Sequence, residues 1–186
     1  MSSNAGGAAA YWLPLLGLLT GARLSELAQL KVADICLSTL RIQIQESDDY
    51  QHLKTPSARR SIPLHSELIR LGFIDYVLKQ ARNSESSLWS ELPKRENKAG
   101  GFFSVWFSVY KKECGIPTDV DFHSFRHTVR TKLVQQRINE SIIDKLLGHA
   151  PTGSTGARIY THVDEFLSDA VESIDIPAIR QLVPIK

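Results

Sequence analysis

Cysteine is scarce in this chain of 186 residues, and so are side-chain clusters that bind metals. The two cysteines, Cys36 and Cys114, lie far apart and form no CxxC pair or cysteine–histidine group. This pattern argues against a zinc site and is typical of reduced thiols in a cytoplasmic protein. The sequence also lacks the run of paired carboxylates that magnesium-dependent nucleases need. We therefore expect neither a metal nor a cofactor.

Long hydrophobic runs are absent as well. The longest, Ala8 to Leu19, has 12 residues and contains Pro14 and Gly17. A bilayer span takes roughly 20 residues, so this stretch predicts a buried helix and no membrane partner. No Lys or Arg precedes it, which argues against a signal peptide. We interpret residues 1–7 as a tag or a truncation scar.

Charge of one sign is not in large excess. The formal net charge is only +2, which gives weak support for a nucleic-acid partner. Its distribution is more informative, because residues 122–139 contain no acid but include Arg126, Arg130 and Lys132. Residues 54–60 add three cations without an acid. Either run alone is typical of a solvated surface, but together they allow a basic face on a nearly neutral protein.

Hydrophobic periodicity predicts mostly helices with a few short strands. The expected helices span residues 8–19, from about 23 onward, 67–82, 102–114, 124–136, 141–147 and a segment across 160, and the expected strands span 41–45, 50–53 and 61–64. The aromatic residues at helical spacing in the fourth of these helices (Phe103, Trp106, Phe107 and Tyr110) are interpreted as core. The sequence thus predicts a predominantly α-helical α+β domain with a small three-stranded antiparallel sheet packed at one edge.

Six polar residues along the chain form a set that suits chemistry at a phosphodiester. They are Arg23 in TGARLSEL, Lys54 in HLKTPSARRSIPL, His123 and Arg126 in HSFRHT, His149 in LLGHAP and Tyr160 in ARIYTHV. Cations can hold the phosphate and stabilise the charge that gathers on its oxygens in the transition state. A tyrosine supplies an oxygen that can attack phosphorus.

Two short spacings support this grouping. His123 and Arg126 are three residues apart, so on one helical turn they point the same way. Glu26 follows Arg23 by three residues and can pair with it on a helix. That pair fits either an ordinary surface ion pair or a carboxylate that supports a catalytic arginine. His127 points about 100° away from Arg126 and is interpreted as a packing or supporting histidine.

In order, spacing and flanking residues, the set resembles the catalytic domain of tyrosine recombinases, the phage integrase family, from about residue 11 to 163. The resemblance implies an integrase-type fold and an enzyme that cleaves and rejoins double-stranded DNA through a 3′-phosphotyrosine, without metal or ATP. It also implies other protomers as partners, in a tetrameric synapse on DNA. The segment between His149 and Tyr160 is longer than the common family spacing, and its Gly153 and Gly156 predict a flexible tether.

The resemblance also implies a role for each residue of the set. The phosphate is bound by Arg23 and Arg126 with His123 beside them, His149 helps to hold it, Lys54 protonates the departing 5′-oxygen, Tyr160 is the nucleophile and Glu26 supports Arg23. Candidate DNA contacts in the two basic runs are Arg59, Arg60, Arg130 and Lys132.

Two alternative functions remain at this point, a type IB topoisomerase-like enzyme and a non-catalytic DNA-binding relative. We expect a catalytic domain at 8–163 and a C-terminal tail helix within 164–186 as a candidate protomer-docking segment. Because the helical core-binding domain of recombinases has no counterpart in the sequence, the isolated domain is expected to be a monomer. A bacterial or phage protein of this kind is expected in the cytoplasm, associated with the nucleoid.

Overall fold

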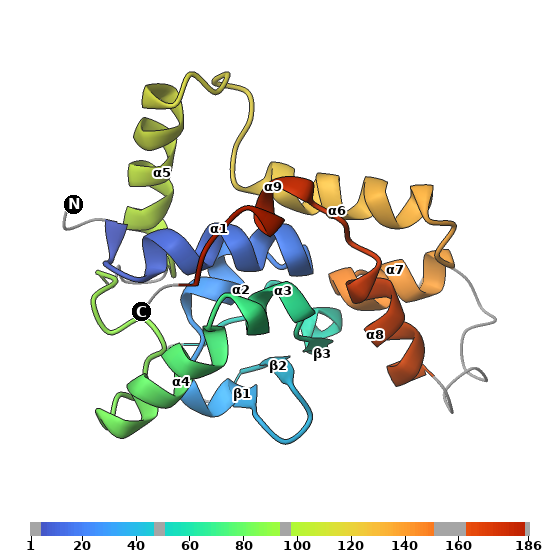
Figure 1. The fold of residues 1–186 in the computed structure, drawn as a ribbon, viewed down its shortest axis with the longest axis horizontal. Helices are drawn as coiled ribbons and strands as arrows, with labels where there is room; N and C mark the ends of the chain where they lie inside the picture. Colours follow the sequence, from blue (N-terminus) through green and yellow to red (C-terminus); the bar gives the residue numbers. More distant parts are fainter. Residues whose placement is uncertain (1–4, 47–50, 94–97, 151–162, 185–186) are drawn as a thin grey trace.

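The computed structural model describes residues 5–46, 51–93, 98–150 and 163–184. Helix α1 (Ala9–Thr20) crosses the middle of the molecule and packs against α2 and α6 (Figure 1). Its side chains are buried on nearly all sides, with Leu13 and Leu16 completely inaccessible, as predicted for a buried helix. Within the described residues, no helix is long and apolar enough to cross a membrane.

The prediction of a mostly helical chain is confirmed. The further helices are α2 (Leu24–Ala28), α3 (Ser66–Arg70), α4 (Phe73–Arg82), α5 (Gly101–Glu113), α6 (His123–Gln135), α7 (Glu140–Leu147), α8 (Val163–Glu172) and α9 (Pro177–Arg180), with short 3-10 turns η2 (Val32–Asp34) and η3 (Pro56–Ala58). Helices α6 and α7 match the expected segments 124–136 and 141–147 within a residue at each end.

The sheet has the predicted size and direction but one strand differs. Strands β1 (Ile35–Cys36), β2 (Arg41–Ile44) and β3 (Arg60–Pro63) form an antiparallel sheet in the order β1-β2-β3. The prediction of a strand at 50–53 is wrong, because residues 51–53 are not in a strand. The Gln29 side chain binds this segment instead, donating to the carbonyl of His52 at 3.1 Å and accepting its N–H at 3.0 Å. With two residues, β1 is too short to show a periodic pattern.

The prediction of a single helix over 67–82 is also wrong. The segment forms two helices, α3 and α4, separated at Gly72, whose φ of 92° lies in the left-handed region that glycine adopts without strain. The break changes the side of the second helix that faces the core. Phe73 and Val77 are therefore buried, whereas Ile74 is only partly covered.

Helix α5 projects from the body of the molecule near one end of α1 (Figure 1). Of its aromatic residues, Phe103 is fully buried, as predicted. Trp106 and Phe107 are only partly buried, and Tyr110 is 47% exposed, stacking on Trp106 with the ring centroids 5.0 Å apart. The prediction of a core stripe is therefore wrong for Tyr110, which lies toward the outer end of this projecting helix.

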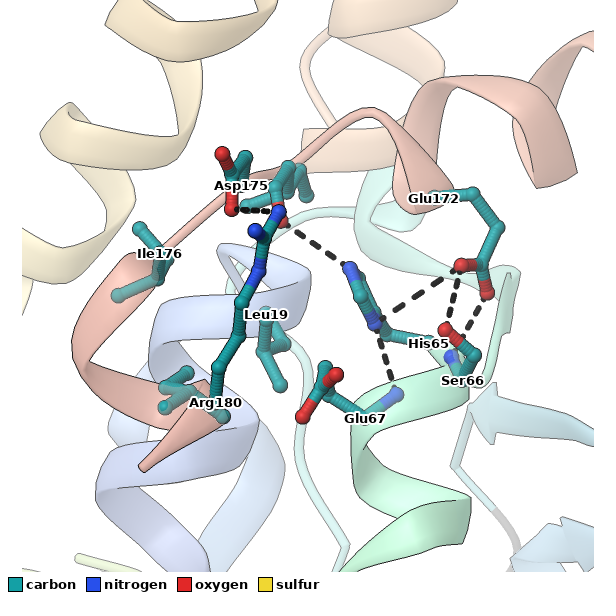
Figure 2. Close-up of a pocket in the computed structure, with 10 residues that line it drawn as sticks. Leu19, His65, Ser66, Glu67, Glu172, Asp175, Ile176 and Arg180 are labelled. Atoms are coloured by element: carbon teal, nitrogen blue, oxygen red, sulfur yellow. Dashed lines mark hydrogen bonds and ion pairs between the residues drawn. The ribbon is translucent and has the colours of Figure 1, made fainter. Parts of the chain in front are cut away.

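The C-terminal segment packs against its own chain. Its apolar residues, including Leu167, Val171 and Ile174, join the hydrophobic core. A cavity of about 160 Å³ lies between this segment and the start of α3. Figure 2 shows the residues that line it. Beside it, Glu172 accepts hydrogen bonds from the N–H and hydroxyl of Ser66, both at 2.7 Å. His65 lies 3.1 Å from the carbonyl of Ile174 through Nε2. Polar contacts and apolar burial together hold α8 in place.

Candidate active site

The turn between α1 and α2 places the first arginine of the set. Gly21 ends α1 with φ at 67°, and Arg23 precedes the first residue of α2. The carboxylate of Glu26 accepts the backbone N–H of Arg23 at 2.9 Å and pairs with its guanidinium, Nη1 to Oε1, at 2.7 Å. The expected pairing is confirmed, and because the Glu26 side chain is buried, it is more than a surface ion pair.

A second arginine pairs with the same carboxylate. Arg60 on β3 places Nη2 at 2.8 Å from Oε2 of Glu26, with both side chains buried. Burial alone would raise the pKa of Glu26, but the charge and hydrogen bond of Arg60, followed by the hydrogen bonds of Arg23, bring it below its ordinary value. Arg60 was a candidate DNA contact in the sequence. Its burial is a correction, because a side chain directed into the protein does not suit direct contact with DNA.

Arg126 on α6 completes the group. Its guanidinium donates to the carbonyl of Gly21 at 2.8 Å and to the carbonyl of Leu147 at the end of α7. Burial, followed by the charges of Arg23 and Arg60, lowers the pKa of Arg126 to about 10. We call Arg23, Arg60 and Arg126, gathered around Glu26, the arginine cluster. Three guanidiniums and one carboxylate leave an excess of positive charge that favours an anion.

His123 is the first residue of α6, one turn before Arg126. Its pKa is lowered, first by partial burial, then by His127 and Arg126, with a smaller effect from Arg23. These influences put His123 beside the arginine cluster and favour its neutral form. His127, expected to be a packing or supporting histidine, is exposed and contacts His123 edge to face at 4.9 Å between ring centroids.

His149 follows the end of α7, where Gly148 adopts φ at 70°. Its Nδ1 lies 3.0 Å from Oδ1 of Asp144, an acid outside the set predicted from the sequence. The same oxygen lies 3.3 Å from Nη1 of Arg130, which also pairs with Glu140. The available signal was an acid on the helix that ends immediately before the histidine. Asp144 orients the His149 ring by its contact with Nδ1. Nε2 of the same ring is left for other partners.

The structure does not bring the whole set together. Lys54 is exposed in the segment between β2 and β3, and among the described residues no hydrogen bond or ion pair joins it to the arginine cluster. Tyr160 lies outside the described residues. Arg59 is exposed and Lys132 partly so. In the part of the chain that the structure describes, no three His, Cys, Asp or Glu side chains are grouped to hold a metal.

Helices thus surround a small antiparallel sheet, and the arginine cluster lies beside His123 at one site. The model of the phage integrase family matches residues 3–166, and the chain belongs to this family. The predicted resemblance is therefore confirmed.

Among relatives, the chain is 28% identical over 168 residues to a tyrosine recombinase of Pseudothermotoga lettingae, covering 88% of this chain and 53% of the relative. It is 30% identical over 163 residues to tyrosine recombinase XerA of Pyrococcus horikoshii, covering 85% and 53%. The chain thus spans about half the length of these relatives.

Two solved structures show the same fold. The integrase from mycobacterium phage Brujita superposes with a TM-score of 0.60 at 17% identity, covering 94% of this chain and 53% of that one. A XerA recombinase superposes with a TM-score of 0.52 at 20% identity, covering 96% and 58%. The predicted integrase-type fold is confirmed.

Proposed function

We propose that this chain is the catalytic domain of a site-specific DNA recombinase that breaks and rejoins strands through a 3′-phosphotyrosine, without metal or ATP. The observation that carries the proposal is the arginine cluster. Arg23 and Arg126 come from segments far apart in the sequence, yet Arg126 donates to the carbonyl of Gly21, two residues before Arg23. The charge of Arg23 lowers the pKa of Arg126, and the charges of both arginines lower the pKa of His123. An excess of fixed positive charge at one point suits the scissile phosphate.

Arg23 and Arg126 would bind the non-bridging oxygens of that phosphate. Both are held by hydrogen bonds to the protein before DNA arrives, so little reorganisation accompanies binding. Their charges then stabilise the negative charge that grows on phosphorus oxygens in the transition state. His149, oriented by Asp144, would donate a further hydrogen bond.

The chemical step would exchange one phosphodiester for another. The phenol oxygen of Tyr160 forms a bond to phosphorus while the bond to the 5′-oxygen breaks. His123, whose lowered pKa keeps it neutral near pH 7, is able to accept the phenol proton. Lys54 would give a proton to the departing 5′-oxygen. The freed 5′-hydroxyl of a partner strand can then reverse the reaction, so the bond energy is conserved and ATP is not needed.

Double-stranded DNA is the proposed partner, with other protomers in a tetrameric synapse of the complete protein, in the cytoplasm of a bacterial or phage-infected cell. The relatives are named tyrosine recombinases, which supports this function over a topoisomerase-like or a non-catalytic one.

The nucleophile provides the test. A suicide DNA substrate carrying the target sequence from the native genome, incubated with the chain, should give a covalent adduct that migrates slowly on a denaturing gel. Tyr160→Phe should abolish the adduct and leave non-covalent DNA binding nearly intact, since only one oxygen is removed. An adduct that persists and maps to another residue would show that Tyr160 is not the nucleophile. No adduct with the wild-type chain on its native site would contradict the function.

A further inference from the structure

Arg60 has a position that the proposed chemistry does not explain. Its side chain is 3% exposed, and its three nitrogens each donate one hydrogen bond. The acceptors are the carbonyl of Leu146 at 2.7 Å, the carbonyl of Ala58 at 2.7 Å and Oε2 of Glu26 at 2.8 Å. They belong to the end of α7, the segment before β3, and α2. One side chain therefore joins the segments that carry His149, Lys54 and Arg23.

Glu26 is shared between two arginines. One oxygen lies 2.7 Å from Nη1 of Arg23 and the other 2.8 Å from Nη2 of Arg60, and the carboxylate side chain is only 4% exposed. Without Arg60, this buried group would have Arg23 as its remaining ion-pair partner. Burial would then favour the neutral acid. A protonated Glu26 no longer has the charge that holds the Arg23 guanidinium.

The end of α7 packs directly on Arg60. Gly148 has φ at 70°, and a Cβ placed there would lie 2.7 Å from Nη1 of Arg60 and 3.2 Å from Cα of Ala58. Glycine allows the backbone turn to approach the guanidinium this closely. Because His149 is the next residue, its backbone position depends on the same contact.

We propose that Arg60 is a positioning residue for the recombinase chemistry proposed above, on which this inference rests. Its ion pair orients Glu26 against Arg23, and its two carbonyl contacts fix the turn before His149 and the segment before β3 around the same carboxylate. This role needs the planar fork of arginine, with donors in three directions. A lysine could keep the charge, but its single nitrogen could not span the three acceptors.

The chain offers a matched control in Arg70. Its guanidinium also bonds one carboxylate and two carbonyls, those of Glu67, Ile179 and Leu182, at 2.8, 3.0 and 3.0 Å. This group lies on α3 against the C-terminal segment rather than at the arginine cluster. Arg70→Met therefore removes a similar set of bonds without touching the site.

The experiment compares Arg60→Met, Arg60→Lys and Arg70→Met with the wild type. Adduct formation is measured in single turnover with saturating suicide DNA between pH 6 and 8, and is expressed per folded molecule from thermal unfolding. The titration of the Glu26 carboxyl is followed by carbon NMR without DNA. Arg60→Met should raise the pKa of Glu26 and slow cleavage about 10- to 100-fold, because a small misplacement of catalytic groups costs that much.

The slowing should grow as the pH falls, because more Glu26 becomes protonated. Arg60→Lys should restore the pH profile of the wild type but only part of its rate, and Arg70→Met should keep the wild-type rate. A purely structural role would lower the folded fraction without this pH-dependent loss. If Arg60→Met does not fold, Arg60→Lys provides the test, and a wild-type cleavage rate in that variant overturns the proposal. The proposal is also overturned if Arg60→Met raises the pKa of Glu26 but leaves the cleavage rate unchanged. An inactive wild type would instead contradict the proposed function itself.

Discussion

The candidate site has a buried half and an exposed half, and they are built differently. Arg60, Arg126 and Glu26 are buried, with hydrogen bonds to backbone carbonyls, backbone N–H groups or each other. Lys54 and His123 are exposed, and within the described residues no hydrogen bond ties either side chain to the rest of the protein. The fold thus assembles the groups that would bind phosphate in advance. It leaves the groups that would exchange protons open to solvent and substrate.

A physical reason underlies this division. A buried guanidinium is tolerated only when most of its donors have acceptors, so its position is set by the packing of several elements. Once set, it interacts strongly with an anion because little water screens it. A proton donor or acceptor has the opposite requirement, since it must approach a reacting oxygen that is absent until DNA binds. The comparison predicts that variants of the two halves differ in folding stability as well as in activity.

The largest effect is expected from Arg126→Met. It removes a phosphate ligand, which should slow adduct formation about 100- to 1,000-fold. It also leaves the carbonyls of Gly21 and Leu147 without this donor, at a cost of about 1–3 kcal/mol each in the free energy of unfolding. Single-turnover cleavage and urea unfolding measure the two losses. A variant that loses activity but keeps full stability would break the comparison, because the buried half would then not be part of the fold's framework.

Lys54→Ala should have the reverse profile. Because Lys54 is exposed, the free energy of unfolding should change by less than about 0.5 kcal/mol. Cleavage of a normal phosphodiester should slow about 100-fold, since the departing 5′-oxygen would lack its acid. A 5′-bridging phosphorothioate leaves as a thiolate without a proton and should largely rescue the variant. Equal losses of rate on both substrates would mean that Lys54 contributes to DNA binding instead. Lys79→Ala on α4 serves as the control for the loss of an exposed lysine.

The smallest effect concerns His123 and requires no mutation. Its pKa should lie below the ordinary histidine value, so the unfolded chain binds this proton more tightly than the folded one. Its contribution to stability is therefore present above the unfolded pKa and is lost as the pH falls through the folded pKa. Sulfate bound at Arg23 and Arg126 should raise the pKa, because a nearby anion favours the imidazolium. Proton–nitrogen NMR titrations with and without sulfate measure the change. An unchanged pKa would separate His123 from the anion site.

Local sequence patterns predicted much of the fold. The amphipathic periods of α6 and α7 and the alternation in β2 depend on neighbours within one element, so they were visible in the sequence. The predictions were wrong where a backbone conformation or a contact from a distant residue outweighed the local pattern. Gly72 separates two helices by its backbone geometry, and the Gln29 side chain binds the backbone of His52, within the segment expected to be a strand.

The candidate site shows the same limit. The spacing of Arg23 and Glu26 was enough to predict their ion pair, although Arg23 immediately precedes α2 and does not lie within it. Asp144 and Arg60 were not assigned these roles. An acid next to a helix end and a cation in a basic run both have ordinary explanations when only the sequence is considered. Their roles depend on contacts with His149 and with Glu26, which is 34 residues before Arg60.

By itself, the sequence determined the family and the identity of the residues that resemble its catalytic set, because these reside in short motifs with characteristic neighbours. Only the tertiary structure decided which cations are buried, which share one carboxylate and which face solvent. Burial and pKa depend on atoms that converge from α2, β3, α6 and α7, and no local spacing encodes that convergence. The basic run at 54–60 illustrates the difference: Lys54 and Arg59 face solvent, whereas Arg60 points inward to Glu26.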